Sequence, residues 1–208
     1  MSATKATLPL AVLCLSAGLA QAADRFPELQ PGQMNPEQKK VADAIMSGPR
    51  KSLSGPFNAW LRSPELADRL QKVGEYLRFN TSLPHRLNEF AILITGREWN
   101  SQYEWFAHYP LAIKAGLDPK VAADVAAGRR PEGMKDDERI VYDFSTELRR
   151  TKTVSDTTYK AAVDAFGEQG VMDLIAVNGY YDLVSMTLNV ADVKVPSGAQ
   201  PPLPPLTR

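Results

Sequence analysis

The stretch LPHRLNEFAILITGREWNSQYEWFAHYPLAIKAGL, residues 83–117, decides the fold expected for this chain. Its apolar residues recur at helical spacing, and it contains no alternating pattern and no Asn-Gly turn that would indicate strands. We expect two successive helices, 84–99 and 101–116, the first apolar over so wide a face that it should be buried. The stretch also holds both histidines of the protein, His85 and His108.

Each histidine has a glutamate four residues away, which places the pair one turn apart on the same face of a helix. The pairs are His85 with Glu89, and Glu104 with His108. A carboxylate in that position orients the imidazole ring, fixes its tautomer and raises its pKa, as a general acid or base requires. A structural interpretation stays open, because Ser101 and Glu104 also have the spacing of a capping box.

Other residues of the stretch are candidates for binding a substrate. Arg86 lies one turn from Glu89, so it can pair with that carboxylate or offer a cation to an anionic substrate. Trp105 is a candidate for lining a cavity. A metal site built from histidines and glutamates of two helices is the alternative, but the chain has only 2 histidines and no repeated Glu-x-x-His motif. We expect no metal.

The rest of the chain carries helix start and stop signals. Asn35, Ser63 and Asp118 can each cap a helix, and each is followed by a proline that fits the first helical position. The sequence predicts an all-α compact bundle of seven to eight helices. The further helices expected cover 35–48, 63–79, 118–128, 135–150, 155–166 and 168–191, and residues 57–62 are a short apolar segment.

The first 22 residues have the pattern of a secretory signal peptide. Lys5 provides the positive region, an apolar run follows, and Ala20-Gln21-Ala22 fits a cleavage site. An uncleaved anchor helix is the alternative. Cleavage near Ala22 predicts a periplasmic or secreted protein with no stable membrane association. It also removes Cys14, the only cysteine, so the mature chain has no thiol.

The composition shows no overall charge bias. Lys+Arg and Asp+Glu are both 24, and no basic cluster is interleaved with aromatic residues, so we expect no nucleic acid as a partner.

Behind the signal peptide we expect a helical extension over 23–54, a domain over 55–193 and a Pro-rich disordered tail over 194–208. Because it is rich in proline, the tail cannot form a helix; an arm laid across a neighbouring subunit is the alternative.

Taken together, these residues resemble the carboxymuconolactone decarboxylase-like superfamily, which also contains alkylhydroperoxidase D. In the peroxidase branch a glutamate on one helix is followed by a helix bearing Cys-x-x-Cys-x-x-x-His. The matching positions are Glu89 for the glutamate, Ser101 and Glu104 for the cysteines, and His108 for the histidine. The resemblance covers 55–193 and implies an alkylhydroperoxidase D-like helical fold, assembled as a homo-oligomer, either a trimer or a hexamer.

The missing cysteines separate the two activities that the resemblance implies, peroxide reduction and decarboxylation. Peroxide reduction needs one thiolate to attack the O–O bond and a second thiol to resolve it, which Ser101 and Glu104 cannot supply. The decarboxylase branch is similar in carrying Glu-x-x-x-His without cysteines. The resemblance thus implies a cofactor-free lyase of aromatic compound catabolism, acting on a small carboxylated lactone or aromatic-derived acid. Its catalytic residues would be His108, Glu104 and Glu89, and its substrate-binding residues Arg86, Ser101 and Trp105.

Two other functions remain open on the same fold. One is a different proton-transfer enzyme, such as an isomerase or a lactone hydrolase. The other is a non-catalytic exported protein that binds a small aromatic or lactone ligand.

Overall fold

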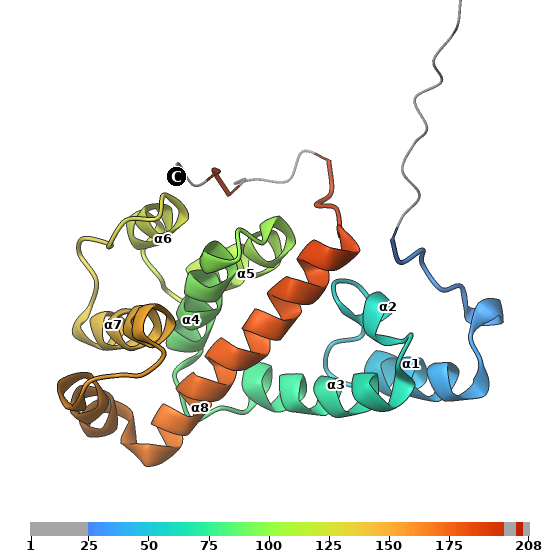
Figure 1. Ribbon diagram of the computed structural model, residues 1–208, viewed down its shortest axis with the longest axis horizontal. Helices are drawn as coiled ribbons and strands as arrows, with labels where there is room; N and C mark the ends of the chain where they lie inside the picture. The colour runs from blue at the N-terminus through green and yellow to red at the C-terminus, as the bar shows by residue number, and fades with distance from the viewer. Residues whose placement is uncertain (1–24, 198–202, 206–208) are drawn as a thin grey trace, which may run out of the picture.

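Helix α4 (His85–Glu98) lies at the centre of the structure, and every residue on it from Leu87 to Arg97 is buried. The expected buried helix is therefore confirmed. The structure is a computed structural model that describes residues 25–197 and 203–205. Helices α5, α6, α7 and α8 all pack against α4, as the green centre of Figure 1 shows.

The described residues form an all-α bundle of eight helices with one short 3₁₀ helix, η1, and no strand, as the sequence predicted. The elements are η1 (Pro31–Gln33), α1 (Pro36–Ser47), α2 (Phe57–Trp60), α3 (Pro64–Phe79), α4 (His85–Glu98), α5 (Gln102–Lys114), α6 (Pro119–Ala126), α7 (Asp136–Thr151) and α8 (Asp156–Ala191).

The helices start and stop largely where local signals predict. Asn35 accepts a hydrogen bond from the backbone N–H of Gln38, whose side chain accepts from the Asn35 N–H in return. The Asp118 side chain caps α6 by accepting a hydrogen bond from the Lys120 N–H at 2.8 Å. Gly167 has a φ of 68° inside α8, so the chain breaks there into the two helices expected on either side.

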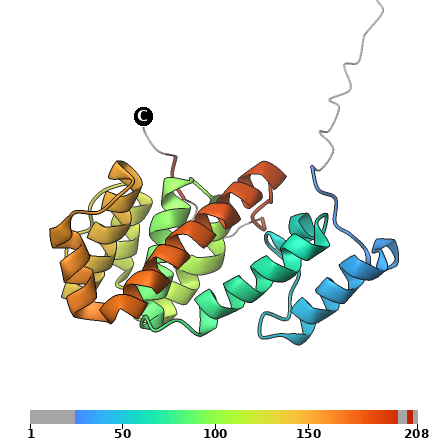
Figure 2. The ribbon, with the colours of Figure 1, turned by 60° about the horizontal axis from the view of Figure 1, so that its bottom comes forward.

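The N-terminal helices stand to one side of the bundle. Helix α1 packs on α3, and α3 in turn contacts α8, which crosses the whole molecule (Figure 1). The turned view of Figure 2 shows α1 and α3 side by side, next to the bundle formed by α4–α8. The α3–α8 contact places the end of α3 beside the middle of α8, where the candidate site lies.

Part of the Pro-rich tail is held against its own chain. The side-chain amide of Gln102 donates to the Leu203 carbonyl at 2.7 Å and accepts from the Leu203 N–H at 3.0 Å, and Leu203 is buried. Arg97 donates to the Pro204 carbonyl. Residues 203–205 therefore differ from the expected disordered tail, because these polar side chains bind its backbone.

The expected signal peptide lies outside the described residues. No helix within residues 25–197 or in the 203–205 segment is long and apolar enough to cross a membrane.

Candidate functional site

The candidate site forms where α4 and α5 pack against each other. Helix α4 ends in a turn in which Asn100 takes a left-handed φ of 48° and the Ser101 N–H bonds back to the Gly96 carbonyl at 2.8 Å. This turn sends α5 back along α4 and brings His108 beside Glu89, a residue of the preceding helix.

His108 is held between two buried carboxylates. Its Nδ1 lies 2.6 Å from Oε2 of Glu89, and its Nε2 lies 3.0 Å from Oε1 of Glu104. All three side chains are nearly inaccessible to solvent. His85 lies apart from them, with a side chain that is 56% exposed and an Nε2 that is 3.8 Å from Glu89. The two His/Glu pairs are thus not equivalent, because Glu89 bonds to the histidine of the next helix.

The two glutamates determine the charge of His108. Burial alone would lower the pKa of this imidazole, but the carboxylates of Glu89 and Glu104 outweigh burial and raise the pKa from 6.5 to about 9. The ring is therefore an imidazolium at neutral pH and has a proton to donate.

A cavity of about 250 Å³ opens beside His108. Glu104 and His108 form part of its wall, whereas Glu89 lies behind the ring and does not line it. Other side chains of the wall come from the loop before α2, from the start of α2, from the end of α3, from α5 and from α8. They include Arg50, Phe57, Arg78, Tyr103, Tyr180 and Tyr181.

Two adjacent tyrosines of α8 face this cavity. The Tyr181 ring meets the His108 ring edge-on at 5.2 Å, and the Tyr180 ring is 5.4 Å from that of Tyr181. Burial raises the pKa of Tyr180 to about 12, and burial with the nearby glutamates raises that of Tyr181 well above its ordinary value. Both phenols therefore keep their protons and remain hydrogen-bond donors.

Several buried polar atoms around the cavity have no hydrogen-bond partner among the residues that the structure describes. They are the hydroxyl of Tyr181, Oε1 of Glu89 and of Glu104, and Nε and Nη2 of Arg50. The contact of Glu104 with His108 is close but is not aligned as a hydrogen bond. Buried polar groups are normally paired, so this concentration of unpaired groups beside a cavity suggests a site that a ligand completes.

The predicted substrate-binding residues do not line this cavity. Arg86 forms ion pairs with Asp137, at 2.7 Å, and with Glu138 of α7. It therefore does not pair with Glu89, because α7 offers it two other carboxylates. Ser101 and Trp105 are buried, and the Trp105 ring stacks on Tyr109 instead.

The predicted capping box at the start of α5 is wrong. The Ser101 side chain makes no capping hydrogen bond, and its hydroxyl has no partner within the described part of the chain. Glu104 turns towards His108 because the imidazolium is the stronger partner for its carboxylate.

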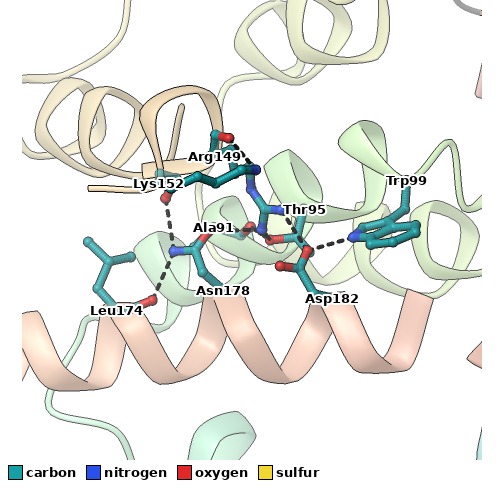
Figure 3. A network of polar contacts seen from close by, with 9 residues as sticks. Ala91, Thr95, Trp99, Arg149, Lys152, Leu174, Asn178 and Asp182 are labelled. Carbon is teal, nitrogen blue, oxygen red and sulfur yellow. Dashed lines mark hydrogen bonds and ion pairs between the residues drawn. The ribbon is translucent and has the colours of Figure 1, made fainter. Parts of the chain in front are cut away.

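A second polar cluster explains the polar residues that recur along α8. Arg149 of α7 donates to Asp182 at 2.6 Å, to Thr95 of α4 at 2.6 Å and to Asn178 at 3.1 Å, as the dashed lines of Figure 3 show. Asp182 also accepts from the Trp99 indole at 2.6 Å. We call Thr95, Arg149, Asn178 and Asp182 the Arg149 cluster. It joins three helices.

Sequence reasoning missed the cationic part of the wall. Nothing in the pattern around Arg50 or Arg78 distinguishes them from surface arginines, and both lie far along the chain from His108. Tyr180 and Tyr181 had one weak signal, their position on an apolar helix that also bears polar residues at helical spacing.

Among residues 25–197 and 203–205, no group of three or more His, Cys, Asp or Glu side chains is arranged to hold a metal ion. No protein-family model, no curated protein and no solved structure matches this chain.

Proposed function

We propose that this chain is a cofactor-free acid–base enzyme of the carboxymuconolactone decarboxylase-like type, with an alkylhydroperoxidase D-like fold. Its substrate would be a small carboxylated lactone or aromatic-derived acid. The observation that carries the proposal is His108, clamped between Glu89 and Glu104 at the wall of a cavity. Burying three such groups together is costly for stability, and strongly shifted pKa values at a cavity are typical of catalytic sites.

The reaction proposed is the loss of CO₂ from a β,γ-unsaturated acid. The bond between the carboxylate carbon and the ring breaks, and its electron pair moves into the adjacent unsaturated carbonyl as an enolate. The distal carbon of the enolate then takes a proton from His108. The imidazole left behind regains a proton from water, so the net change is consumption of one proton and release of one CO₂. The substrate carries its own electron sink and needs no cofactor.

The residues of the site have distinct roles in this scheme. Glu89 orients the imidazole from behind through Nδ1 and keeps it charged. The proton on Nε2, next to Glu104, is the one at the cavity side. Tyr181 is a residue of the same cavity wall, and its buried hydroxyl has no partner in the described structure; we assign to it the donation to the enolate oxygen as charge develops there.

A peroxidase is disfavoured on chemical grounds, because Cys14 is the only cysteine and it lies in the proposed signal peptide. We propose further that the mature protein is periplasmic or secreted, acts on a small molecule and forms a homo-oligomer.

The test is an assay of the mature chain with a panel of β,γ-unsaturated carboxylated lactones in D₂O. CO₂ release is followed by mass spectrometry, and deuterium at the distal carbon by NMR. His108→Gln should slow turnover by about 10²- to 10⁴-fold, the usual contribution of a general acid. His85→Gln is the matched control, because it removes an exposed histidine of α4, and should keep near wild-type turnover.

Either of two results would contradict the proposal. One is turnover unchanged in His108→Gln. The other is binding of these acids by the wild-type chain without CO₂ release, which would make it a binding protein instead.

A further inference from the structure

Two arginines line the cavity without a carboxylate partner. Most arginines of the described structure bind neighbouring groups of the protein. Arg86 pairs with carboxylates of α7, and Arg149 pairs with a carboxylate of α8. Arg50 and Arg78 form no salt bridge and no side-chain hydrogen bond among the described residues, and both face the cavity. Nε and Nη2 of Arg50 are buried, and a buried polar group without a partner is costly.

The surroundings of Arg50 hold its guanidinium in place. Its Cζ lies 5.1 Å from the centroid of the Phe57 ring and 5.9 Å from that of Phe79, within the range of cation–π contacts. Gly74 of α3 provides the space that the Arg50 guanidinium occupies. A Cβ at this position would lie 2.7 Å from Nη2 of Arg50 and would overlap the Tyr180 hydroxyl. The arginine head is therefore positioned before any ligand arrives.

The charges around the cavity do not balance. Apart from His108, which bonds to Glu89 behind it, the cavity is lined by two arginines, Arg50 and Arg78, and by one acidic residue, Glu104. One negative charge on a ligand would restore neutrality. Arginine suits a carboxylate, because its planar fork donates two parallel hydrogen bonds.

The size and the wall of the cavity suggest what carries that charge. A cavity of roughly 150 Å³ holds a benzene ring, so about 250 Å³ has room for one ring with small substituents. Phe57, Tyr103, Tyr180 and Tyr181 provide aromatic faces and edges for such a ring.

We propose that Arg50, assisted by Arg78, binds a carboxylate of a single-ring acid, one that stays on the molecule when CO₂ leaves, and so determines the substrate class of this site. This inference rests on the proposed function and assigns to Arg50 the anchoring role that the sequence assigned to Arg86. Arg50 lies in the 23–54 segment, so residues outside the expected 55–193 domain complete the cavity.

The test uses the full mature chain, with benzoate as the anionic probe and benzamide as its neutral counterpart, in isothermal titration calorimetry. Arg50→Gln should weaken benzoate binding about 10- to 100-fold, the worth of a charge-assisted hydrogen-bonded pair, and should change benzamide binding little. Arg50→Lys should restore part of the affinity, because it keeps the charge and loses the fork.

Arg150→Gln is the matched control, since it removes an equal charge from an exposed position of α7 and should leave benzoate binding unchanged. Absence of benzoate binding to the wild-type chain, or equal binding by Arg50→Gln, would overturn the inference. His108→Gln separates it from the proposed function: that variant should lose turnover and still bind benzoate more tightly than Arg50→Gln does.

Discussion

The His108 site and the Arg149 cluster both place charged side chains where other helices pack against α4, yet the polar groups of the two regions are paired very differently. The Arg149 guanidinium reaches Thr95, Asn178 and Asp182, and only its Nε has no partner among the described residues. Around His108, the Tyr181 hydroxyl and the head of Arg50 stay unpaired beside a cavity.

The difference shows that neither buried charge nor cavity size is sufficient to locate a functional site. A larger depression of about 560 Å³ lies over the Arg149 cluster, but Arg149 and Asp182 at its wall are already bonded to each other, as in Figure 3. The smaller cavity at His108 combines a proton donor with unpaired donors. We therefore interpret the Arg149 cluster as structural and the His108 site as functional.

The largest effect on stability is expected from breaking the Arg149 cluster. Arg149→Met should lower the free energy of unfolding by roughly 3 kcal/mol, because it leaves Asp182 and Asn178 without their shared donor. Urea unfolding followed by circular dichroism measures this change. Turnover per folded molecule should stay close to wild type, and a selective loss of turnover would make the cluster part of the catalytic machinery.

The next effect concerns the pKa of His108. In Glu89→Gln, burial still lowers this pKa while one of the two carboxylates that raise it is gone, so the value should fall well below about 9. NMR titration of the imidazole measures it, and the alkaline limit of turnover should move to lower pH with it. Asp182→Asn removes a carboxylate of the other cluster and should leave the pKa of His108 unchanged. An equal shift in both variants would contradict a local cause.

Between pH 6.5 and about 9, stability should depend on pH through His108. Because the folded pKa of His108 is raised from 6.5 to about 9, the stabilisation is complete below pH 6.5 and is lost as the pH rises through 9. The free energy of unfolding should therefore fall over this interval in the wild type and in Arg149→Met. In His108→Gln the contribution of the imidazole is removed, so the free energy of unfolding should no longer fall over this interval because of His108. A pH dependence in that variant equal to the wild type would refute the assignment of the effect to His108.

Local signals in the sequence predicted the helices well. Caps such as Asn35 and breaks such as Gly167 act within a few residues, so the sequence alone specifies them. Periodicity was a weaker guide to burial. Leu66 and Val73 continue the apolar repeat of α3, yet each is nearly half exposed, because the repeat indicates a face and does not say what covers it.

The site was predictable only in part. Glu104 and His108 follow from their spacing on one helix, and the resemblance alone linked Glu89 to His108. Arg50, Arg78 and Tyr181 reach the cavity through tertiary packing of three separate segments, which no local pattern indicates. The capping box failed for a different reason, because Glu104 lies against His108, one turn further along the same helix, and not against the Ser101 backbone.

The smallest changes in stability are expected from removing one hydroxyl group in each region. The hydroxyl of Ser145 is paired and that of Tyr181 is not. Ser145→Ala removes an acceptor 3.1 Å from the Asn178 amide, which keeps its bond to the Leu174 carbonyl, so the loss should be about 1 kcal/mol. Tyr181→Phe removes a buried hydroxyl that has no partner in the described structure. Its free energy of unfolding should equal or exceed that of the wild type by up to about 1 kcal/mol.

The effects of these two substitutions on turnover should be the reverse of their effects on stability. Tyr181→Phe loses a donor to the developing enolate and should slow CO₂ release by about 10²-fold, near the effect of removing one oxyanion donor. Ser145→Ala should not slow CO₂ release, because the Ser145 hydroxyl bonds to Asn178 of the Arg149 cluster. Denaturant unfolding and the CO₂ assay on both variants decide the matter. If Tyr181→Phe were destabilised and fully active, its hydroxyl would be a structural group and the contrast between the two regions would not hold.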